Sequence, residues 1–83
     1  MNIIYSNHVI TMIEILRRHG IYVDKNLIED IVRDSEKPVQ GYKNRLIAQK
    51  KINETHVMRV VYEELNNIIE IVTVYPGRIN RYD

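Results

Sequence analysis

Apolar residues near the start of the chain recur at a helical spacing. Four of them stand at positions i, i+3, i+4 and i+7, which predicts a helix that buries one face. Ser6 or Asn7 can cap this helix, because a side-chain oxygen there accepts an unpaired N–H of the first turn. Gly20 can close its C-terminal end. The apolar residues of the buried face are Val9, Met12, Ile13 and Leu16.

A second helix is predicted after Gly20, and a short strand is predicted before Ser6. Asp24 is a good N-cap, and the residues after it repeat the helical spacing up to a point near Pro38. Residues 2–5 are mostly isoleucine and tyrosine, which favour the extended state. The buried residues of the second helix are expected to be Leu27, Ile28, Ile31 and Val32.

The pattern changes to strands after Pro38. Runs of branched and aromatic residues alternate with turn residues, which predicts an antiparallel meander. Residues 65–67 form a turn, and Pro76 and Gly77 are expected to interrupt the sheet before its last strand. The predicted strands lie within residues 42–51, 56–64, 68–75 and 78–82. The chain is therefore predicted to be an α+β domain of order β-α-α-β-β-β, with two helices on one face of an antiparallel sheet.

Alternation along the two longest strands predicts which side chains face the helices. Successive residues of a strand point to opposite faces of the sheet. The face beneath the helices is expected to hold Met58, Val60, Tyr62, Ile69, Ile71, Thr73 and Tyr75. The open face is expected to hold Val57, Arg59, Val61, Ile68, Glu70, Val72 and Val74. A guanidinium on the open face stays hydrated or meets an anion, so Arg59 carries no burial penalty there.

Length and composition indicate one small domain. A chain of 83 residues has room for a single core, so one domain over residues 1–83 is expected. The absence of cysteine excludes disulfides and thiolate sites, and the three histidines lack the spacing of a metal-binding helix. We therefore expect no metal and no cofactor. The chain shows neither a signal peptide nor an apolar run that could span a membrane, which predicts a cytoplasmic protein.

The net charge of +1 conceals an uneven distribution. Residues 37–62 hold six basic residues against one glutamate, whereas the segments before and after them each carry a net charge of −2. A basic segment in a near-neutral chain is typical of a site for an anion such as phosphate, although solvated surface charge explains it equally well. The basic residues are Lys37, Lys43, Arg45, Lys50, Lys51 and Arg59.

Several of these segments together resemble a known family. The run RVVYEE at residues 59–64, the run VTVYPGR at 72–78 and Tyr82 near the C-terminus are similar to the C-terminal half of RelE-type toxins. The SNH segment that ends at His8, together with residues 45–50, extends the resemblance to nearly the whole chain, toward an uncharacterised RelE-like family of bacteria and archaea. The resemblance implies the toxin of a type II toxin–antitoxin system. Such a toxin cuts mRNA without a metal, by attack of the ribose 2′-OH on the adjacent phosphate.

The resemblance also implies roles for individual residues. Arg59 corresponds to the strand arginine that holds the phosphate, and Lys50 to a basic residue on the preceding strand. Arg78 follows the last long strand, Tyr82 matches a C-terminal tyrosine that transfers protons or stacks on bases, and His8 matches a histidine at the helix start. The chemistry needs a guanidinium to stabilise charge on the phosphate, and a base and an acid for proton transfer. Further RNA contacts are expected from Lys43, Arg45, Lys51 and Arg81, and stacking from Tyr42, Tyr75 or Tyr82.

The main candidates also have purely structural interpretations. Arg59 can form a cross-strand ion pair with Glu70. Tyr75 belongs to the face that is predicted to be buried. Because Lys50 and Lys51 are adjacent, only one of them is expected to face the site.

Two classes of function follow from the residues and the resemblance. The first is a toxin-type endoribonuclease that acts on free or ribosome-bound mRNA and is held in check by a small, mostly acidic antitoxin protein. The second is a non-catalytic RNA- or protein-binding module that uses the same basic sheet face. A homodimer is expected when the protein is made alone, because an apolar patch on the open face would favour self-association. The predicted patch consists of Val57, Val61, Val72 and Val74.

Overall fold

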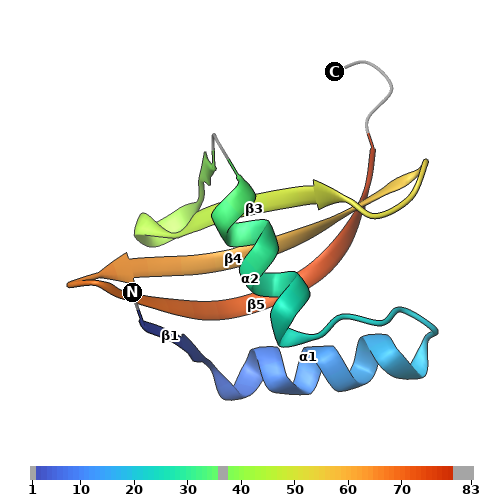
Figure 1. Cartoon of the computed structure of the whole chain (residues 1–83), viewed down its shortest axis with the longest axis horizontal. Coiled ribbons are helices and arrows are strands. Elements are labelled where there is room, and N and C mark those ends of the chain that lie inside the picture. The colour runs from blue at the N-terminus through green and yellow to red at the C-terminus, as the bar shows by residue number, and fades with distance from the viewer. Residues whose placement is uncertain (1, 36–37, 80–83) are drawn as a thin grey trace.

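A computed structural model describes residues 2–35 and 38–79 of the chain. Two helices pack against a five-stranded sheet, with α2 in front of the sheet and α1 alongside β5 (Figure 1), so the predicted α+β class is confirmed. The elements in chain order are β1 (Asn2–Tyr5), α1 (Asn7–Arg18), α2 (Lys25–Asp34), β2 (Val39–Gln40), a 3₁₀ turn (Tyr42–Asn44), β3 (Leu46–Lys51), β4 (His56–Leu65) and β5 (Ile68–Arg78).

The sheet is mixed, whereas an antiparallel sheet was predicted. Its strand order is β1-β5-β4-β3-β2, and β1 pairs parallel with β5 while all other neighbours pair antiparallel. The chain therefore begins beside its last strand, and the two helices form part of the connection from β1 to the rest of the sheet (Figure 1). The predicted element order is only approximate, because the two-residue strand β2 is too short to show an alternating pattern.

The ends of both helices agree with the predicted caps. Ser6 caps α1, since its Oγ accepts the N–H of Val9 at 3.1 Å. Gly20 follows α1 with a φ of 80°, and the N–H groups of Gly20 and Ile21 donate to carbonyls of the last helical turn. Asp24 caps α2 in the same way as Ser6 caps α1. Within the described residues neither helix has the length and apolar character needed to cross a membrane.

The core lies between the helices and the covered face of the sheet. The predicted helix residues line it, with Val9, Leu16, Ile28, Ile31 and Val32 buried and Met12, Ile13 and Leu27 partly buried. The sheet contributes Ala48, Met58, Val60, Tyr62, Ile69, Ile71 and Val74. Burial of these apolar side chains is the main favourable contribution to folding in a domain of this size.

A β-bulge reverses the alternation of β5. The pairing of β4 with β5 shifts between Val61 and Tyr62, which leaves Val72 without a residue opposite it. Beyond this extra residue, Val74 is fully buried in the core, whereas Tyr75 lies on the open face opposite an open-face residue of β4. The predicted assignment of Tyr75 to the covered face and of Val74 to the open face was wrong, because strict alternation allows no inserted residue.

Ser6 joins this bulge to the start of α1. Its hydroxyl donates to the carbonyl oxygen of Val72 at 2.7 Å, and its N–H donates to the carbonyl oxygen of Ile71 at 3.0 Å. The same Oγ accepts the N–H of Val9. One side chain therefore caps the helix and satisfies a carbonyl of the bulge, so the two features stabilise each other.

The predicted break at Pro76 and Gly77 is also wrong. β5 continues through both residues to Arg78, with Pro76 opposite Met58 and Gly77 opposite Val57. β1 pairs only with the first residues of β5, so β5 is an edge strand at this point, where a sheet accepts proline. Residues 80–82 of the predicted edge strand lie outside the described residues.

Candidate functional site

The open face of the sheet carries an arginine between two partners from neighbouring strands. Gln49 of β3 lies opposite Arg59 of β4, and Arg59 lies opposite Tyr75 of β5. Gly77 is two residues further along β5 on the same face. We call Gln49, Arg59, Tyr75 and Gly77 the arginine site.

Two contacts hold the guanidinium of Arg59 in one place. Its Nε donates to Oε1 of Gln49 at 3.1 Å, and its Cζ lies 6.0 Å from the ring centroid of Tyr75. The second distance is within the range at which a cation is attracted to an aromatic ring. Because the contacts come from the strands on either side, the side chain has less freedom than a solvated surface arginine.

Gly77 provides the space that the guanidinium occupies. A Cβ atom at position 77 would lie 2.5 Å from Nη1 of Arg59 and 2.7 Å from its Cζ. Any other residue would therefore push the guanidinium away, which is a known use of glycine within a strand. From the sequence, Gly77 was interpreted as a turn residue because it follows Pro76.

The arginine site has hydrogen-bond donors that its own residues do not use. Nη1 and Nη2 of Arg59 make no hydrogen bond or ion pair with any residue that the structure describes. A guanidinium of this kind can donate two parallel hydrogen bonds to a phosphate. The half-buried ring of Tyr75 offers a surface beside it on which a base could stack.

The predicted ion pair between Arg59 and Glu70 is not formed. Glu70 lies opposite Glu63, four residues further along β4 than Arg59. The inserted residue of the bulge also places Tyr75 opposite Arg59. The structural interpretation of Arg59 as one half of a cross-strand ion pair was therefore wrong.

Of the two adjacent lysines, Lys51 shares the open face with Arg59. Lys51 lies opposite Val57, in the row that also contains Gly77. Lys50 lies opposite Met58 on the covered side, where its Nζ is 3.6 Å from Oδ2 of Asp34 at the end of α2. The lysine that was assigned a catalytic role is therefore on the other face of the sheet from the arginine site.

Among the described residues, none of the remaining predicted catalytic residues contacts Arg59, whose partners are Gln49 and Tyr75. His8 is exposed in the first turn of α1. Arg78 lies opposite His56 at the end of β5, and alternation assigns it to the same side as buried Val74. Tyr82 lies outside the described residues.

The predicted RNA-binding residues are also spread out. Arg45 pairs with Glu63 at 3.1 Å between Nε and Oε1, on the open face but away from Arg59. Lys43 is exposed in the 3₁₀ turn. Arg81 and the side chain of Tyr42 lie outside the described part of the chain. Of the basic residues named from the sequence, Lys51 lies on the open face opposite Val57, two positions from Arg59 in β4.

The predicted apolar patch is smaller than expected. Val74 belongs to the core, and Val57 and Val61 are each only 9% exposed. Other apolar residues of the open face are more accessible, as shown by exposed fractions of 60% for Val39 and 71% for Leu65. The exposed apolar residues of the open face are therefore not the ones that the sequence predicted.

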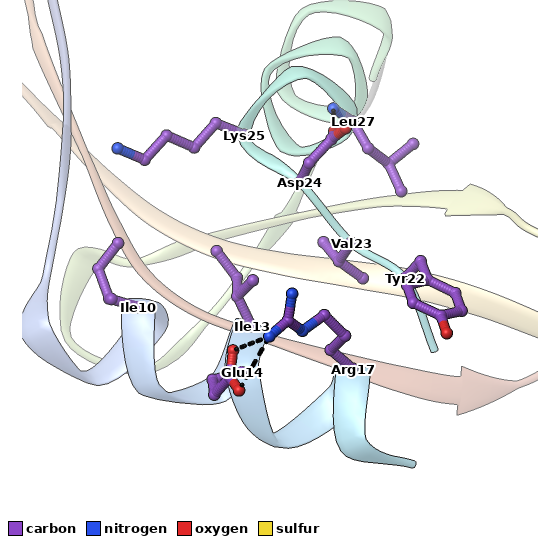
Figure 2. Close-up of a pocket in the computed structure, with 9 residues that line it drawn as sticks. All are labelled: Ile10, Ile13, Glu14, Arg17, Tyr22, Val23, Asp24, Lys25 and Leu27. Carbon is purple, nitrogen blue, oxygen red and sulfur yellow. Dashed lines mark hydrogen bonds and ion pairs between the residues drawn. The ribbon is translucent and has the colours of Figure 1, made fainter. Parts of the chain in front are cut away.

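A groove lies between α1 and α2, away from the open face. It measures about 820 Å³ and is lined by apolar side chains such as Ile10, Ile13 and Tyr22 (Figure 2). Its main polar contact is the ion pair of Glu14 with Arg17, on the surface of α1. Two further charged residues line the groove, but Asp24 caps α2 and Lys25 lies 4.8 Å from the ring centroid of Tyr5. Each charged group therefore has a structural role, and we assign no function to the groove.

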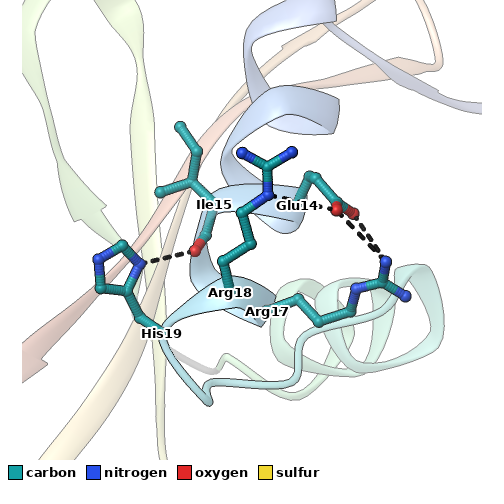
Figure 3. A network of polar contacts seen from close by, with 5 residues as sticks. All are labelled: Glu14, Ile15, Arg17, Arg18 and His19. Carbon is teal, nitrogen blue, oxygen red and sulfur yellow. Dashed lines mark hydrogen bonds and ion pairs between the residues drawn. The ribbon is translucent and has the colours of Figure 1, made fainter.

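The end of α1 carries a surface network of charges. Glu14 contacts both Arg17 and Arg18, and Nδ1 of His19 lies 2.9 Å from the carbonyl oxygen of Ile15 (Figure 3). Such pairs stabilise a helix by a few tenths of a kcal/mol. His19 therefore acts at the helix end. Within residues 2–35 and 38–79, no group of His, Asp and Glu is arranged to hold a metal ion.

The pKa values of two tyrosines on the covered face are raised. Burial, followed by a hydrogen bond to Glu29, raises the pKa of Tyr5 well above its usual range. The hydroxyl of Tyr5 donates to Oε2 of Glu29 at 2.5 Å. Burial, followed by the charge of Glu64, also raises the pKa of Tyr62. Neither phenol shares a face with Arg59, so their role is structural.

Comparison of the chain with known protein families, with curated proteins and with solved structures found no match. The RelE-like resemblance therefore remains an interpretation of the residues, and the arginine site has to be judged on its own geometry.

Proposed function

We propose that this protein binds RNA on the open face of its sheet, with Arg59 holding a backbone phosphate and Tyr75 stacking on a neighbouring base. The observation that carries the proposal is the guanidinium of Arg59. It is held by Gln49 and Tyr75 above Gly77, and its terminal nitrogens have no partner among the described residues. A pre-positioned guanidinium binds phosphate with little loss of side-chain entropy.

We further propose that the bound RNA is cleaved, as in the RelE-like toxins that the sequence resembles. Attack of the 2′-OH on the adjacent phosphate forms a bond from the 2′-oxygen to phosphorus and breaks the bond to the 5′-oxygen, giving a 2′,3′-cyclic phosphate and a 5′-hydroxyl. Arg59 would stabilise the charge that develops on the phosphate oxygens. The 2′-OH loses its proton to water, and the leaving 5′-oxygen gains one. Lys51 and Tyr75, the titratable side chains beside Arg59 on the open face, would supply the second proton.

One observation favours a second candidate, a non-catalytic RNA-binding module. Lys50 was assigned a catalytic role, yet it lies on the opposite side of the sheet from Arg59, next to Asp34. Cleavage would then lack this lysine at the arginine site. RNA binding is common to both candidates, and only the chemical step separates them.

The experiment is an RNA-binding and cleavage assay with a chelator present. Wild-type protein is incubated with labelled single-stranded RNA and with mRNA on ribosomes, and both retention and chain cleavage are measured. We expect binding that weakens with salt, and cleavage products that end in a cyclic phosphate. Arg59→Ala should lose both, while Arg17→Ala, which removes an exposed arginine of α1, should retain both. Binding without products would favour the second candidate, and absence of binding would contradict both.

The proposal implies a protein partner that covers the arginine site. A toxin-type nuclease requires a cognate antitoxin, and an acidic segment would complement Arg59 and Lys51. Purification of the tagged protein from its native host at moderate salt tests this point. A bound acidic protein that is released by Arg59→Glu would support the proposal, and recovery of the protein with no partner would contradict it.

A further inference from the structure

The open face has an acidic end that the arginine site does not use. Glu63 of β4 lies directly opposite Glu70 of β5, and like charges in this arrangement destabilise a sheet. Arg45 pairs with Glu63, but Glu70 forms no ion pair or hydrogen bond with any residue that the structure describes. The acidic end therefore has two neighbouring carboxylates but one guanidinium, which pairs with Glu63, so Glu70 lacks a cation.

The acidic and basic ends are placed symmetrically about the middle of the face. Strand pairing joins Ile47, Val61 and Thr73 in one row across β3, β4 and β5. Along β4, Arg59 precedes Val61 by two residues and Glu63 follows it by two residues. A rotation of 180° about an axis that lies along this row turns the face over and exchanges the two ends.

We propose that two copies of this protein associate through their open faces, about a two-fold axis that runs across the strands at Val61. Arg59 of each copy then lies over the partner's Glu63, and the two carboxylates of each acidic end gain a second guanidinium. The row of Ile47, Val61 and Thr73 meets the same row of the partner. Such an interface is isologous, because each contact occurs twice.

The size of the face suits such an interface. The part of the open face between Val57 and Leu65 spans four or five strands. At the usual spacings along and between strands, its area is on the order of 600 Å². This is comparable to the roughly 800 Å² per partner of a specific complex. Val39, Leu65 and Ile68, which are 60%, 71% and 41% exposed, supply apolar surface toward its rim. Packed sheets lie about 10 Å apart and cross at about 30°, so residues near the axis stay opposite each other.

The inference does not depend on the proposed RNA binding, because it uses the charge pattern of the whole face. If both are correct, the dimer covers Arg59 and competes with RNA. Self-association would then hold the protein in an inactive form whenever it is made without another partner.

The test uses two charge reversals on one face, Arg59→Glu and Glu63→Arg. Each variant alone places like charges at both symmetric contacts, so we expect its dimer dissociation constant to rise about 100-fold. In an equimolar mixture the heterodimer restores both attractive contacts. Sedimentation velocity should therefore show a wild-type dimer, two monomeric variants and a dimer in the mixture. Circular dichroism spectra establish that both variants are folded.

Several outcomes would overturn the proposal. These are a monomeric wild-type protein at its highest soluble concentration, variants that remain dimeric alone, or a mixture that remains monomeric. Cross-linking gives a second, independent measurement, because the chain has no cysteine. Thr73→Cys places a thiol beside the axis and should be joined to its partner by a short bismaleimide. Thr11→Cys on the exposed side of α1 should not be joined, and the reverse pattern would exclude this interface.

Discussion

Arg59 and Tyr75 lie directly opposite each other on the open face, with 6.0 Å between the guanidinium carbon and the ring centroid. They meet because Val72 is inserted into β5 as a bulge residue. Without that residue the alternation of β5 would place Tyr75 beneath the helices. The inserted residue Val72 therefore determines which residues of β5 belong to the arginine site, although Val72 itself lies outside the site.

Gly77→Ala should weaken RNA binding without unfolding the protein. The added Cβ would meet the end of a flexible side chain, so the guanidinium of Arg59 should move at small cost in stability. We expect about a tenfold loss of RNA affinity, the size of one charge-assisted hydrogen bond. Fluorescence anisotropy with labelled RNA measures it. In the Arg59→Ala background the same change should have almost no further effect, and an additive loss would show that Gly77 acts elsewhere.

Ser6→Ala should destabilise the fold more than an ordinary cap substitution. It removes the cap of α1 and leaves the carbonyl of Val72 without its donor, so we expect a loss of about 2 kcal/mol. Urea unfolding measures the change. Thr11→Ala is the matched control, because the Thr11 hydroxyl bonds only to an exposed carbonyl of the same helix. Equal effects of the two substitutions would contradict the link between cap and bulge.

Truncation of the sheet core should cost far more stability than loss of Arg59. Ile71 and Val60 are fully buried, and we expect Ile71→Ala or Val60→Ala to cost roughly 2–4 kcal/mol. Arg59→Ala removes a partly exposed side chain with one hydrogen bond, so about 1 kcal/mol or less is expected. Urea unfolding compares the variants. An Arg59→Ala variant that unfolds would show that this arginine is mainly a structural residue.

The stability of the fold should decrease at alkaline pH. The pKa values of Tyr5 and Tyr62 are raised in the folded state, so their contribution is complete below the unfolded pKa of about 10. It is lost as the pH rises above that value, because the unfolded chain then releases protons that the folded chain retains. Urea unfolding between about pH 8 and about pH 11 measures the slope. Tyr5→Phe should reduce the slope, while Tyr22→Phe, at a position 76% exposed, should leave it unchanged.

The regular parts of this fold could be predicted from the sequence. Helix caps such as Ser6 and Asp24 depend on short-range chemistry, and the buried helix faces follow from residue spacing. The turn at Asn66 and Asn67 also depends on short-range chemistry, because both residues adopt the positive φ that asparagine tolerates in a hairpin.

The arrangement of the candidate site could be predicted only in part. The position of Arg59 on the open face follows from alternation along β4, which is unbroken. Tyr75 and Gly77 could not be assigned to that face, because no local pattern predicts the bulge at Val72, whose carbonyl accepts a hydrogen bond from Ser6, distant in the sequence. The parallel pairing of β1 with β5 is likewise a long-range contact that no local pattern encodes.

The central claim is that the guanidinium of Arg59 binds an RNA phosphate. The most direct measurement follows the Nε–H signals of the arginine side chains by nuclear magnetic resonance while short single-stranded RNA is added, with Arg59→Lys used to assign the signal. We predict that the Arg59 signal shifts in a saturable manner while that of Arg17 on α1 does not move. An unchanged Arg59 signal in protein that binds the RNA, or a shift confined to residues of the helices, would contradict the claim.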